Sequence, residues 1–178
     1  MPTSLASQRI TGADVPGNLG FPLPFGQSGG AQVLAQSAVP VSVTGVLTET
    51  VLATVTVPAG AMGPNGVLRL TTMWSFSSTA VAKTLYARLG GVVFMNPGYN
   101  QAGTASMQHM TFLRNRASQT SQTGFSSASS TPFGTSSIAA QTYSIDTSIA
   151  QSLTLSGKLS DVADSITLES YTVEILNP

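Results

Sequence analysis

Apolar and polar side chains alternate with a period of two from about residue 46 to the end of the chain. This period is typical of β-strands that bury one face, because successive side chains point to opposite sides of a strand. The segment 67–76 is the clearest example. One of its faces carries Leu68, Leu70, Thr72, Trp74 and Phe76. We expect this face to lie in the core, with Trp74 as its largest anchor.

The same alternation, together with many β-branched residues, predicts seven further strands. They span about residues 46–57, 82–90, 92–95, 106–117, 138–146, 150–159 and 165–176. No segment carries the apolar period of a helix of three turns. About eight strands separated by turn-rich connections predict an all-β fold, a jelly-roll-like two-sheet sandwich.

Strict alternation also predicts which side chains share a face at the two ends of this region. In the first strand one face carries Val51, Ala53, Val55 and Val57. In the last strand, Ile166 and Leu168 fall opposite to Tyr171, Val173 and Ile175. The same rule separates Glu169 from Glu174, so these two carboxyls are not expected to work on each other as an acid/base pair.

Two connections carry strong turn signals. The nine residues 58–66, "PAGAMGPNG", predict a turn that joins 50–57 and 67–76 as a hairpin. Gly90 and Gly91 predict a second turn. The segments 50–71 and 151–173 both run as strand, polar turn and strand, an echo too weak to define a repeat.

Residues 1–45 have a different composition, with five prolines, several glycines and apolar residues that occur singly. The stretch "GFPLPFG", residues 20–26, suits an extended segment that lays Phe21, Leu23 and Phe25 on another surface. The alternative is an untethered tail. We therefore expect an extended N-terminal arm over 1–45 and the sandwich domain over 46–178.

Charge is scarce, and this changes the picture of the surface. Charged residues make up 8% of the chain, compared with roughly 25% in average domains, and the formal net charge is zero. A near-neutral surface favours association over life as a lone monomer. Nucleic-acid binding needs clustered Lys and Arg, and only Arg114 and Arg116 lie close in sequence, where two solvated charges on one strand face explain them.

Neither a membrane protein nor a secreted protein is expected. No apolar run reaches the length of about 18 residues that a membrane helix needs. The N-terminus lacks a basic start followed by an apolar core, which a secretory signal would show. We therefore expect the chain to be made and assembled in a cytoplasm.

Candidate chemistry is sparse, and we predict no catalytic, cofactor-binding or metal-binding residues. His109 is the sole histidine, no nucleophile elbow accompanies it, and the chain has no cysteine. Asp161 and Asp164 share a loop and could offer oxygen ligands to calcium, but they do not follow the spacing of an EF-hand. Capping of that turn is the other explanation for both aspartates.

Two loops could make contacts. Tyr99, with Asn100 and Gln101, is the best candidate for a sugar site, the alternative being a turn aromatic packed on its own domain. The polar stretch 118–137 is long for a connection without secondary structure, and such loops are usually functional or mobile. Phe125 and Phe133 within it are either tether points or exposed contacts.

The chain resembles a class of tailed-bacteriophage structural proteins. The matching stretches are Leu52 to Gly66, Leu68 to Ser75, Lys83 to Gly91 and Ile166 to Glu174, and together the resemblance covers the C-terminal three quarters. They contain "VPAGAMGPNG", "LRLTTMWS" and "ITLESYTVE". The resemblance implies a jelly-roll-like module on virions, often a homotrimer, and it does not extend to the first 45 residues.

Two virion roles follow from the resemblance. The first is a head decoration (cement) protein that binds the major capsid protein and stabilises the capsid lattice. The second is a tail fibre or baseplate tip module that binds the host receptor. For a three-fold contact the candidate residues are Val67, Met73, Tyr86, Met110 and Phe112. A glycan hydrolase would need two carboxylates across a cleft, which the seven scattered acidic residues do not offer, so we expect a non-enzymatic protein.

Overall fold

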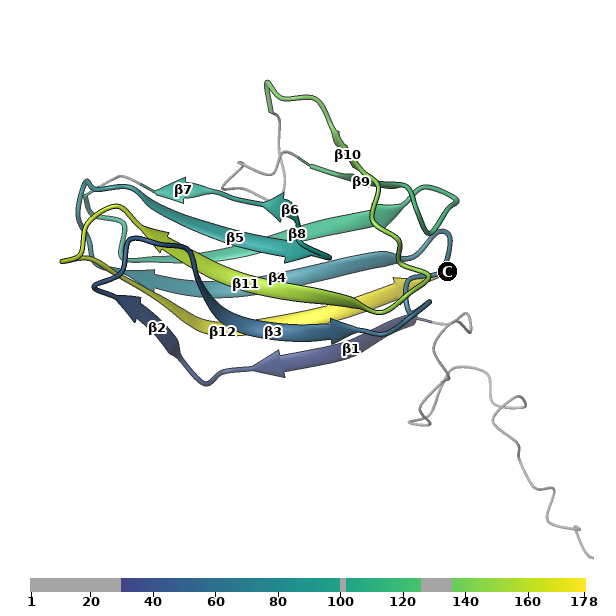
Figure 1. Ribbon diagram of the computed structural model, residues 1–178, viewed down its shortest axis with the longest axis horizontal. Coiled ribbons are helices and arrows are strands. Elements are labelled where there is room, and N and C mark those ends of the chain that lie inside the picture. Colours follow the sequence, from purple (N-terminus) through teal and green to yellow (C-terminus); the bar gives the residue numbers. More distant parts are fainter. Residues whose placement is uncertain (1–29, 100–101, 126–135) are drawn as a thin grey trace, which may run out of the picture.

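The protein is an all-β, jelly-roll-like sandwich of two antiparallel sheets (Figure 1). The computed structural model describes residues 30–99, 102–125 and 136–178. Most strands of both sheets run along the longest axis of the molecule, while the short strands β9 and β10 rise away from it. The fold class expected from the alternation of side chains is confirmed.

The larger sheet has seven strands in the order β1-β12-β4-β8-β9-β10, and β2 follows β1 along the same edge of β12. Its strands are β1 Gly30–Ser37, β2 Val41–Thr44, β4 Val67–Phe76, β8 Ser106–Asn115, β9 Gln122–Gly124, β10 Gln141–Tyr143 and β12 Ser165–Asn177. The five-stranded sheet has the order β3-β11-β5-β6, with β7 also beside β5. Its strands are β3 Thr50–Val57, β5 Lys83–Leu89, β6 Val92–Met95, β7 Gly98–Tyr99 and β11 Gln151–Leu159.

The core lies between the sheets and consists of the predicted inward faces. Leu68, Leu70 and Trp74 on β4 are completely buried, and so are Leu85 and Leu89 on β5. The Trp74 indole N–H donates to Thr72 Oγ1 over 2.8 Å, so the single polar atom of this large side chain is satisfied inside the core. The inward face predicted for 67–76 is therefore confirmed.

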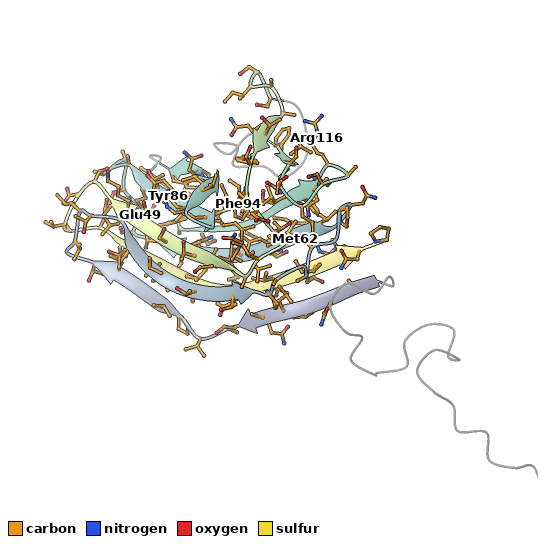
Figure 2. All side chains as sticks on the ribbon, turned by 45° about the vertical axis from the view of Figure 1, so that its right-hand side comes forward. Glu49, Met62, Tyr86, Phe94 and Arg116 are labelled. Atoms are coloured by element: carbon orange, nitrogen blue, oxygen red, sulfur yellow. The ribbon has the colours of Figure 1, made fainter. Side chains whose placement is uncertain are left out.

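The connection 58–66 is not a hairpin, which corrects the sequence-based expectation. β3 lies in the five-stranded sheet and β4 in the seven-stranded one, so the chain crosses from sheet to sheet as an arch. Ala61 and Met62 in this arch are buried and close the end of the core (Figure 2). A tight turn would keep β3 and β4 in one sheet. The nine-residue connection is long enough to cross between the sheets, and its two apolar residues pack into the end of the core.

The second strand–turn–strand segment crosses between the sheets in the same way. β11 leads through residues 160–164 into β12 of the other sheet. β3 pairs with β11 and β4 pairs with β12, so the two similar segments lie strand against strand. The predicted turn at Gly90 and Gly91 does form a hairpin between β5 and β6. Gly90 and Gly91 have φ values of 57° and 80°, in the left-handed region that favours glycine.

A β-bulge corrects the faces predicted for the last strand. The pairing of β12 with β4 slips between Leu168 and Ser170, so Glu169 has no directly opposite partner. The extra residue reverses the alternation, and Ile166, Leu168, Val173 and Ile175 all point into the core. The sequence-based expectation that the two halves face opposite ways is therefore wrong.

A second bulge acts on β3 in the same manner. Its pairing with β11 slips between Ala53 and Val51, which leaves Leu52 as the extra residue. Leu52 is 8% exposed and belongs to the core, whereas Val51 is 54% exposed. Val55 and Val57 are buried as expected, but Val51 does not share their face.

The proposed boundary of the N-terminal arm at residue 45 lies inside the sheet. β1 and β2 both pair with β12, and Val43 is buried in the core. Pro40 falls between the two strands, so the ring removes no ladder donor from either of them. Residues 1–29, which include Phe21, Leu23 and Phe25, lie outside the described residues.

The described residues contain twelve strands, compared with the eight expected. The four additional strands are β1, β2, β7 and β9. They are short or lie in stretches rich in glycine, proline, serine and glutamine, where local composition favours loops. β9 lies inside the predicted 118–137 loop, and β10 covers only the centre of the predicted strand 138–146.

Candidate interaction surface

A buried ion pair joins the two sheets at one end of the sandwich. Lys83 opens β5 on its inward face, and Asp164 directly precedes β12. Their side chains are 2% and 3% exposed, and Lys83 Nζ lies 3.0 Å from Asp164 Oδ2. The hydroxyls of Ser77 and Thr79 also donate to this carboxylate. The Lys83 ammonium, followed by these two hydroxyls, holds the pKa of Asp164 below its usual value despite burial.

This arrangement gives the two aspartates of the calcium hypothesis separate structural roles. The Asp164 carboxylate faces Lys83, while Asp161 Oδ1 accepts from the backbone N–H of Ala163 and caps the turn. In the part of the chain that the structure describes, no three His, Cys, Asp or Glu side chains gather as a metal site would need. Both aspartates are accounted for by the turn and by the ion pair.

Tyr99 packs on its own domain. Its ring stacks on Phe76 with a centroid distance of 5.4 Å, and its hydroxyl contacts Met107 Sδ. The ring is therefore held against the core and is not presented as a platform for a sugar. The other two residues of that hypothesis, Asn100 and Gln101, lie outside the described residues.

Two further ion pairs lie on the outer faces of the sheets. Arg69 on β4 donates two hydrogen bonds of 2.7 Å to Glu174 on β12. Arg88 on β5 pairs in the same bidentate way with Glu49, which also accepts from Ser156 Oγ. Each arginine lowers the pKa of its glutamate partner. The three ion pairs together use six of the fourteen charged residues, so much of the scarce charge serves internal contacts.

Glu169 and Glu174 share an outer face, contrary to the sequence-based expectation. Glu169 contacts the Ser75 hydroxyl and Glu174 pairs with Arg69, and both partners point outward from β4. The cause is the bulge at Glu169. Ser75 and Arg69 are six positions apart on β4, about 20 Å along a strand. The carboxyls are thus too far apart to act on one bond, which keeps the earlier conclusion for a different reason.

His109 lies inside the sandwich. It is 4% exposed and stands opposite Thr72 in the pairing of β8 with β4. This placement agrees with a packed histidine.

A network of buried amides that the alternation did not reveal fastens the opposite end of the sandwich. The side chain of Gln122 is fully buried and pairs with both backbone groups of Ile145, accepting from its N–H at 2.8 Å and donating to its C=O at 2.9 Å. The same amide donates to Asn115, which in turn donates to Thr147 and to the 58–66 arch. One feature of the sequence could have indicated this network. Asn115 lies two residues after Leu113, so the alternation places its polar side chain on the same inward face of the strand.

The predicted trimer face is divided between two surfaces. Val67, Met73, Met110 and Phe112 lie together on the outer face of the seven-stranded sheet, where β4 pairs with β8. Tyr86 lies on the outer face of the other sheet, beneath the guanidinium of Arg88 and near Glu49 (Figure 2). The five residues therefore do not form one face. The alternation of side chains shows which residues of a strand share a face, but it does not show which sheet the strand joins.

Arg114 and Arg116 are both exposed, Arg114 on β8 and Arg116 one residue past its end. Arg114 lies over the ring of Phe112 at 4.5 Å on the outer face of β8. Arg116 follows the end of β8 in the turn toward β9 and is exposed.

Six exposed apolar side chains belong to β1, β2, β3 and the segments that connect these strands. We call this part of the sandwich the β1–β3 side, and we define it by the exposed residues Val33, Val39, Val41, Val46, Leu47 and Val51. These are six of the eleven large apolar residues that are exposed in the described part of the chain. Between residues 30 and 51 the sequence has a single charge, Glu49, and Arg88 neutralises it.

The same side carries two open strand edges. β1 with β2 ends the seven-stranded sheet and β3 ends the five-stranded sheet, and all three lie along one side in both views (Figures 1 and 2). β1 and β3 each have eight residues and contain neither a charge nor a proline. Monomeric proteins usually protect such edges with charges, prolines or covering segments. Exposed apolar residues beside two strand edges without charges make this side suited to contact with another chain.

Comparisons with known proteins add little to this description. No family model and no curated protein matches the chain. Among solved structures, the chain is similar to dimeric latent PorU from Porphyromonas gingivalis, with a TM-score of 0.38 and 11% identity. That similarity covers 70% of this chain and 10% of the PorU chain, and at this score it carries no argument about fold or function. The described residues contain no helix that could span a membrane.

Proposed function

We propose that this chain is a non-enzymatic structural protein of a tailed-bacteriophage particle, a homotrimeric head decoration protein that binds the major capsid protein and stabilises the capsid lattice. The observation that carries the proposal is the β1–β3 side, where exposed apolar residues and two uncharged strand edges lie together. The sequence resemblance to virion proteins is the reason for proposing a phage particle as the site of assembly.

The distribution of charge supports a role in assembly. Lys83, Asp164, Arg69, Glu174, Arg88 and Glu49 pair within the chain. Surfaces that keep charge for solubility repel copies of themselves, whereas a neutral surface with an apolar patch lets subunits approach. Val67, Met73, Met110 and Phe112 on the outer face of the paired strands β4 and β8 are candidates for a second contact.

The rigidity of the sandwich also suits this role. The Lys83–Asp164 pair closes one end, and the Gln122–Asn115 network closes the other. A decoration protein stabilises a shell by making several modest contacts at once, and rigid subunits hold those contacts in register. Many weak contacts per particle then add to a large total without a catalytic site.

The alternative is a tail fibre or baseplate tip module that binds the host receptor. The projecting β9–β10 hairpin favours it, because exposed loops on a rigid sandwich are common binding sites (Figure 1). Ile138, near β10, is an exposed apolar side chain there. The β1–β3 side favours the decoration role, since it is suited to lateral contact.

Co-sedimentation of the full chain with expanded, emptied phage heads tests the proposal. A decoration protein should sediment with heads and raise their rupture temperature, while a receptor-binding tip should ignore heads and bind host cells. Light scattering after size-exclusion chromatography should give a trimer mass. A chain that stays monomeric at high concentration and ignores heads would overturn both particle roles.

A further inference from the structure

The Lys83–Asp164 pair holds an amine and a carboxyl in contact inside the sandwich. Among the ion pairs of the described residues it alone is almost fully enclosed, with side chains 2% and 3% exposed. Lys83 Nζ lies 3.0 Å from Asp164 Oδ2. Because Cγ is one C–O bond of about 1.2 Å from Oδ2, Nζ lies no more than about 4.2 Å from Cγ. Attack on a carbon begins at about 3–3.5 Å, so only a small movement is needed.

We propose that Lys83 and Asp164 condense into an isopeptide bond after the chain has folded. Nζ bonds to Cγ, the bond between Cγ and Oδ2 breaks, and Oδ2 leaves as water. The ammonium gives two of its three protons to this water and keeps one as the amide N–H. The atoms balance without an oxidant or a reductant. The inference is independent of the proposed particle role, because the chemistry lies within one chain.

Thr79 provides the path for the protons. Its Oγ1 accepts from Lys83 Nζ over 2.8 Å and lies 2.9 Å from each carboxylate oxygen of Asp164, to which it donates. A hydroxyl can accept one proton while it donates another, so a proton passes from the ammonium to the carboxylate through Thr79. The transfer yields a neutral amine with a free lone pair and a neutral acid, which are the forms that react.

The hydrogen bonds around the pair also fit the amide product. Ser77 Oγ donates to Asp164 Oδ1 over 2.8 Å, and it stabilises the charge that develops on this oxygen during attack. In the product Oδ1 is the amide oxygen and keeps this donor. The new amide N–H keeps the carbonyl oxygen of Val81, 3.0 Å from Nζ, as its acceptor. Both polar atoms of the product therefore have partners in place.

Burial favours the amide over the ion pair. Two enclosed charges lose hydration that their attraction must offset, whereas an amide with both hydrogen bonds made costs less to bury. Contact within one fold also corresponds to an effective concentration of about 10⁵ M or more for well-oriented groups. Water is the reagent of the reverse reaction, and it has little access to the enclosed pair.

The ion pair is the resting form, and the amide forms slowly from it. The Lys83 ammonium holds the pKa of Asp164 below its usual value, so the neutral acid is a minor species. The freshly folded chain therefore carries the ion pair, and the amide accumulates as the folded chain ages.

The bond would tie β5 of one sheet to the start of β12 in the other. It links positions about 80 residues apart, and a link of this length restricts the unfolded chain as a long disulfide loop does. The chain has no cysteine that could form a disulfide. The amide is thus a covalent tie that a cysteine-free sandwich can make from its own side chains.

Intact-mass spectrometry of the denatured full chain tests the proposal. The chain is refolded from urea and sampled over several days. We expect its mass to fall by that of one water molecule, at a rate that does not depend on protein concentration. A sample kept in urea should keep its full mass, because the two groups do not meet in the unfolded chain. A folded chain that keeps its full mass throughout would overturn the proposal.

The two lysines of the chain provide a matched pair of variants. Lys83→Met should keep its full mass. Lys158→Met, which removes the exposed lysine on β11, should lose water at the rate of the parent. Loss of water in Lys83→Met would assign the loss to another reaction, such as cyclisation of an aspartate, and would contradict the proposal.

Trypsin digestion of the aged parent locates the bond without any variant. Trypsin does not cleave after a lysine whose Nζ is part of an amide. Peptide 70–88 should therefore stay uncut at Lys83 and carry peptide 159–178 through Asp164. Fragmentation of the linked peptide identifies both residues. A loss of water without this linked peptide would overturn the assignment.

Two variants of Thr79 test the proton path. Thr79→Val should slow the loss of water by about 10²-fold, the lower end of general acid–base catalysis. Thr79→Ser keeps the hydroxyl and should stay close to the parent rate. The melting temperature of each freshly folded variant checks that the fold is intact. Equal rates in the two variants would contradict the role of Thr79.

Discussion

Lys83 Nζ lies 3.0 Å from Asp164 Oδ2, and this buried contact ties β5 of one sheet to the start of β12 in the other. Both side chains are almost fully enclosed, and the Ser77 and Thr79 hydroxyls complete the environment of the carboxylate. A charge left alone in such a place is strongly unfavourable, whereas the intact pair with its hydrogen bonds is tolerated.

Lys83→Met should therefore destabilise the protein more than the double variant Lys83→Met/Asp164→Leu. The single change leaves the Asp164 carboxylate buried without its cation, while the double change replaces the pair by apolar groups. We expect the melting temperature to fall by about 10 °C in the single variant and by clearly less in the double variant. Calorimetry of both proteins gives the comparison, and equal losses would contradict a coupled pair.

Stability should fall in acid because basic partners lower the pKa values of three carboxyls. Asp164, Glu49 and Glu174 have pKa values below their ordinary 3.8, 4.5 and 4.5, each mainly through its basic partner. A carboxyl whose pKa is lower in the folded state stabilises the fold above its unfolded pKa. That contribution is lost as the pH falls through the folded pKa.

Glu174→Gln tests one of these carboxyls, which lies on the outer face and is only partly shielded. The variant should be less stable than the parent at about pH 7 by no more than about 1 kcal/mol. The difference should shrink as the pH falls through the lowered pKa of Glu174 and the parent carboxyl becomes protonated. Urea unfolding across this range measures it. A difference that persists in acid would show that the Arg69 contact acts through packing instead of charge.

The close approach at Gly66 should make this position intolerant of a side chain. A Cβ there would lie 2.6 Å from Asn177 Oδ1 and 2.8 Å from the backbone N of Gly63. Gly66→Ala must displace the end of the arch, at a cost of about 1–3 kcal/mol. Gly98→Ala is the matched control, because nothing lies within 4 Å of a Cβ at that site. Chemical unfolding of both variants should separate them.

The bulge in β3 can be tested by two neighbouring truncations. Leu52→Ala should cost about 2–3 kcal/mol, because its side chain is buried. Val51→Ala should change stability by less than about 0.5 kcal/mol, since Val51 is exposed. Strict alternation of the strand predicts the reverse order, so denaturant midpoints of the two variants decide between the registers.

Charge on the β1–β3 side should weaken assembly without weakening the fold. Leu47→Lys places an ammonium among the exposed apolar residues, and it should lower the oligomer mass seen by light scattering while the melting temperature stays within about 2 °C. Val162→Lys, also exposed but in the loop before β12, is the control and should leave the mass unchanged. Loss of assembly in both variants would indicate a general charge effect.

The sequence by itself determined the all-β class, because a period of two is a local property that each strand displays alone. It determined the inward face of β4, with Leu68, Leu70 and Trp74, and the turn at Gly90 and Gly91. It also showed the scarcity of charge, which is visible in composition alone.

Only the tertiary structure decided which sheet each strand joins, because pairing partners lie far apart in the chain and alternation does not encode them. It placed 58–66 as an arch and brought β1 and β2 onto β12. The bulges at Leu52 and Glu169 reverse a face through register with a partner strand, so no single strand could reveal them. The enclosure of Lys83 by Asp164 arises in the same way, from two segments that meet only when the sheets pack.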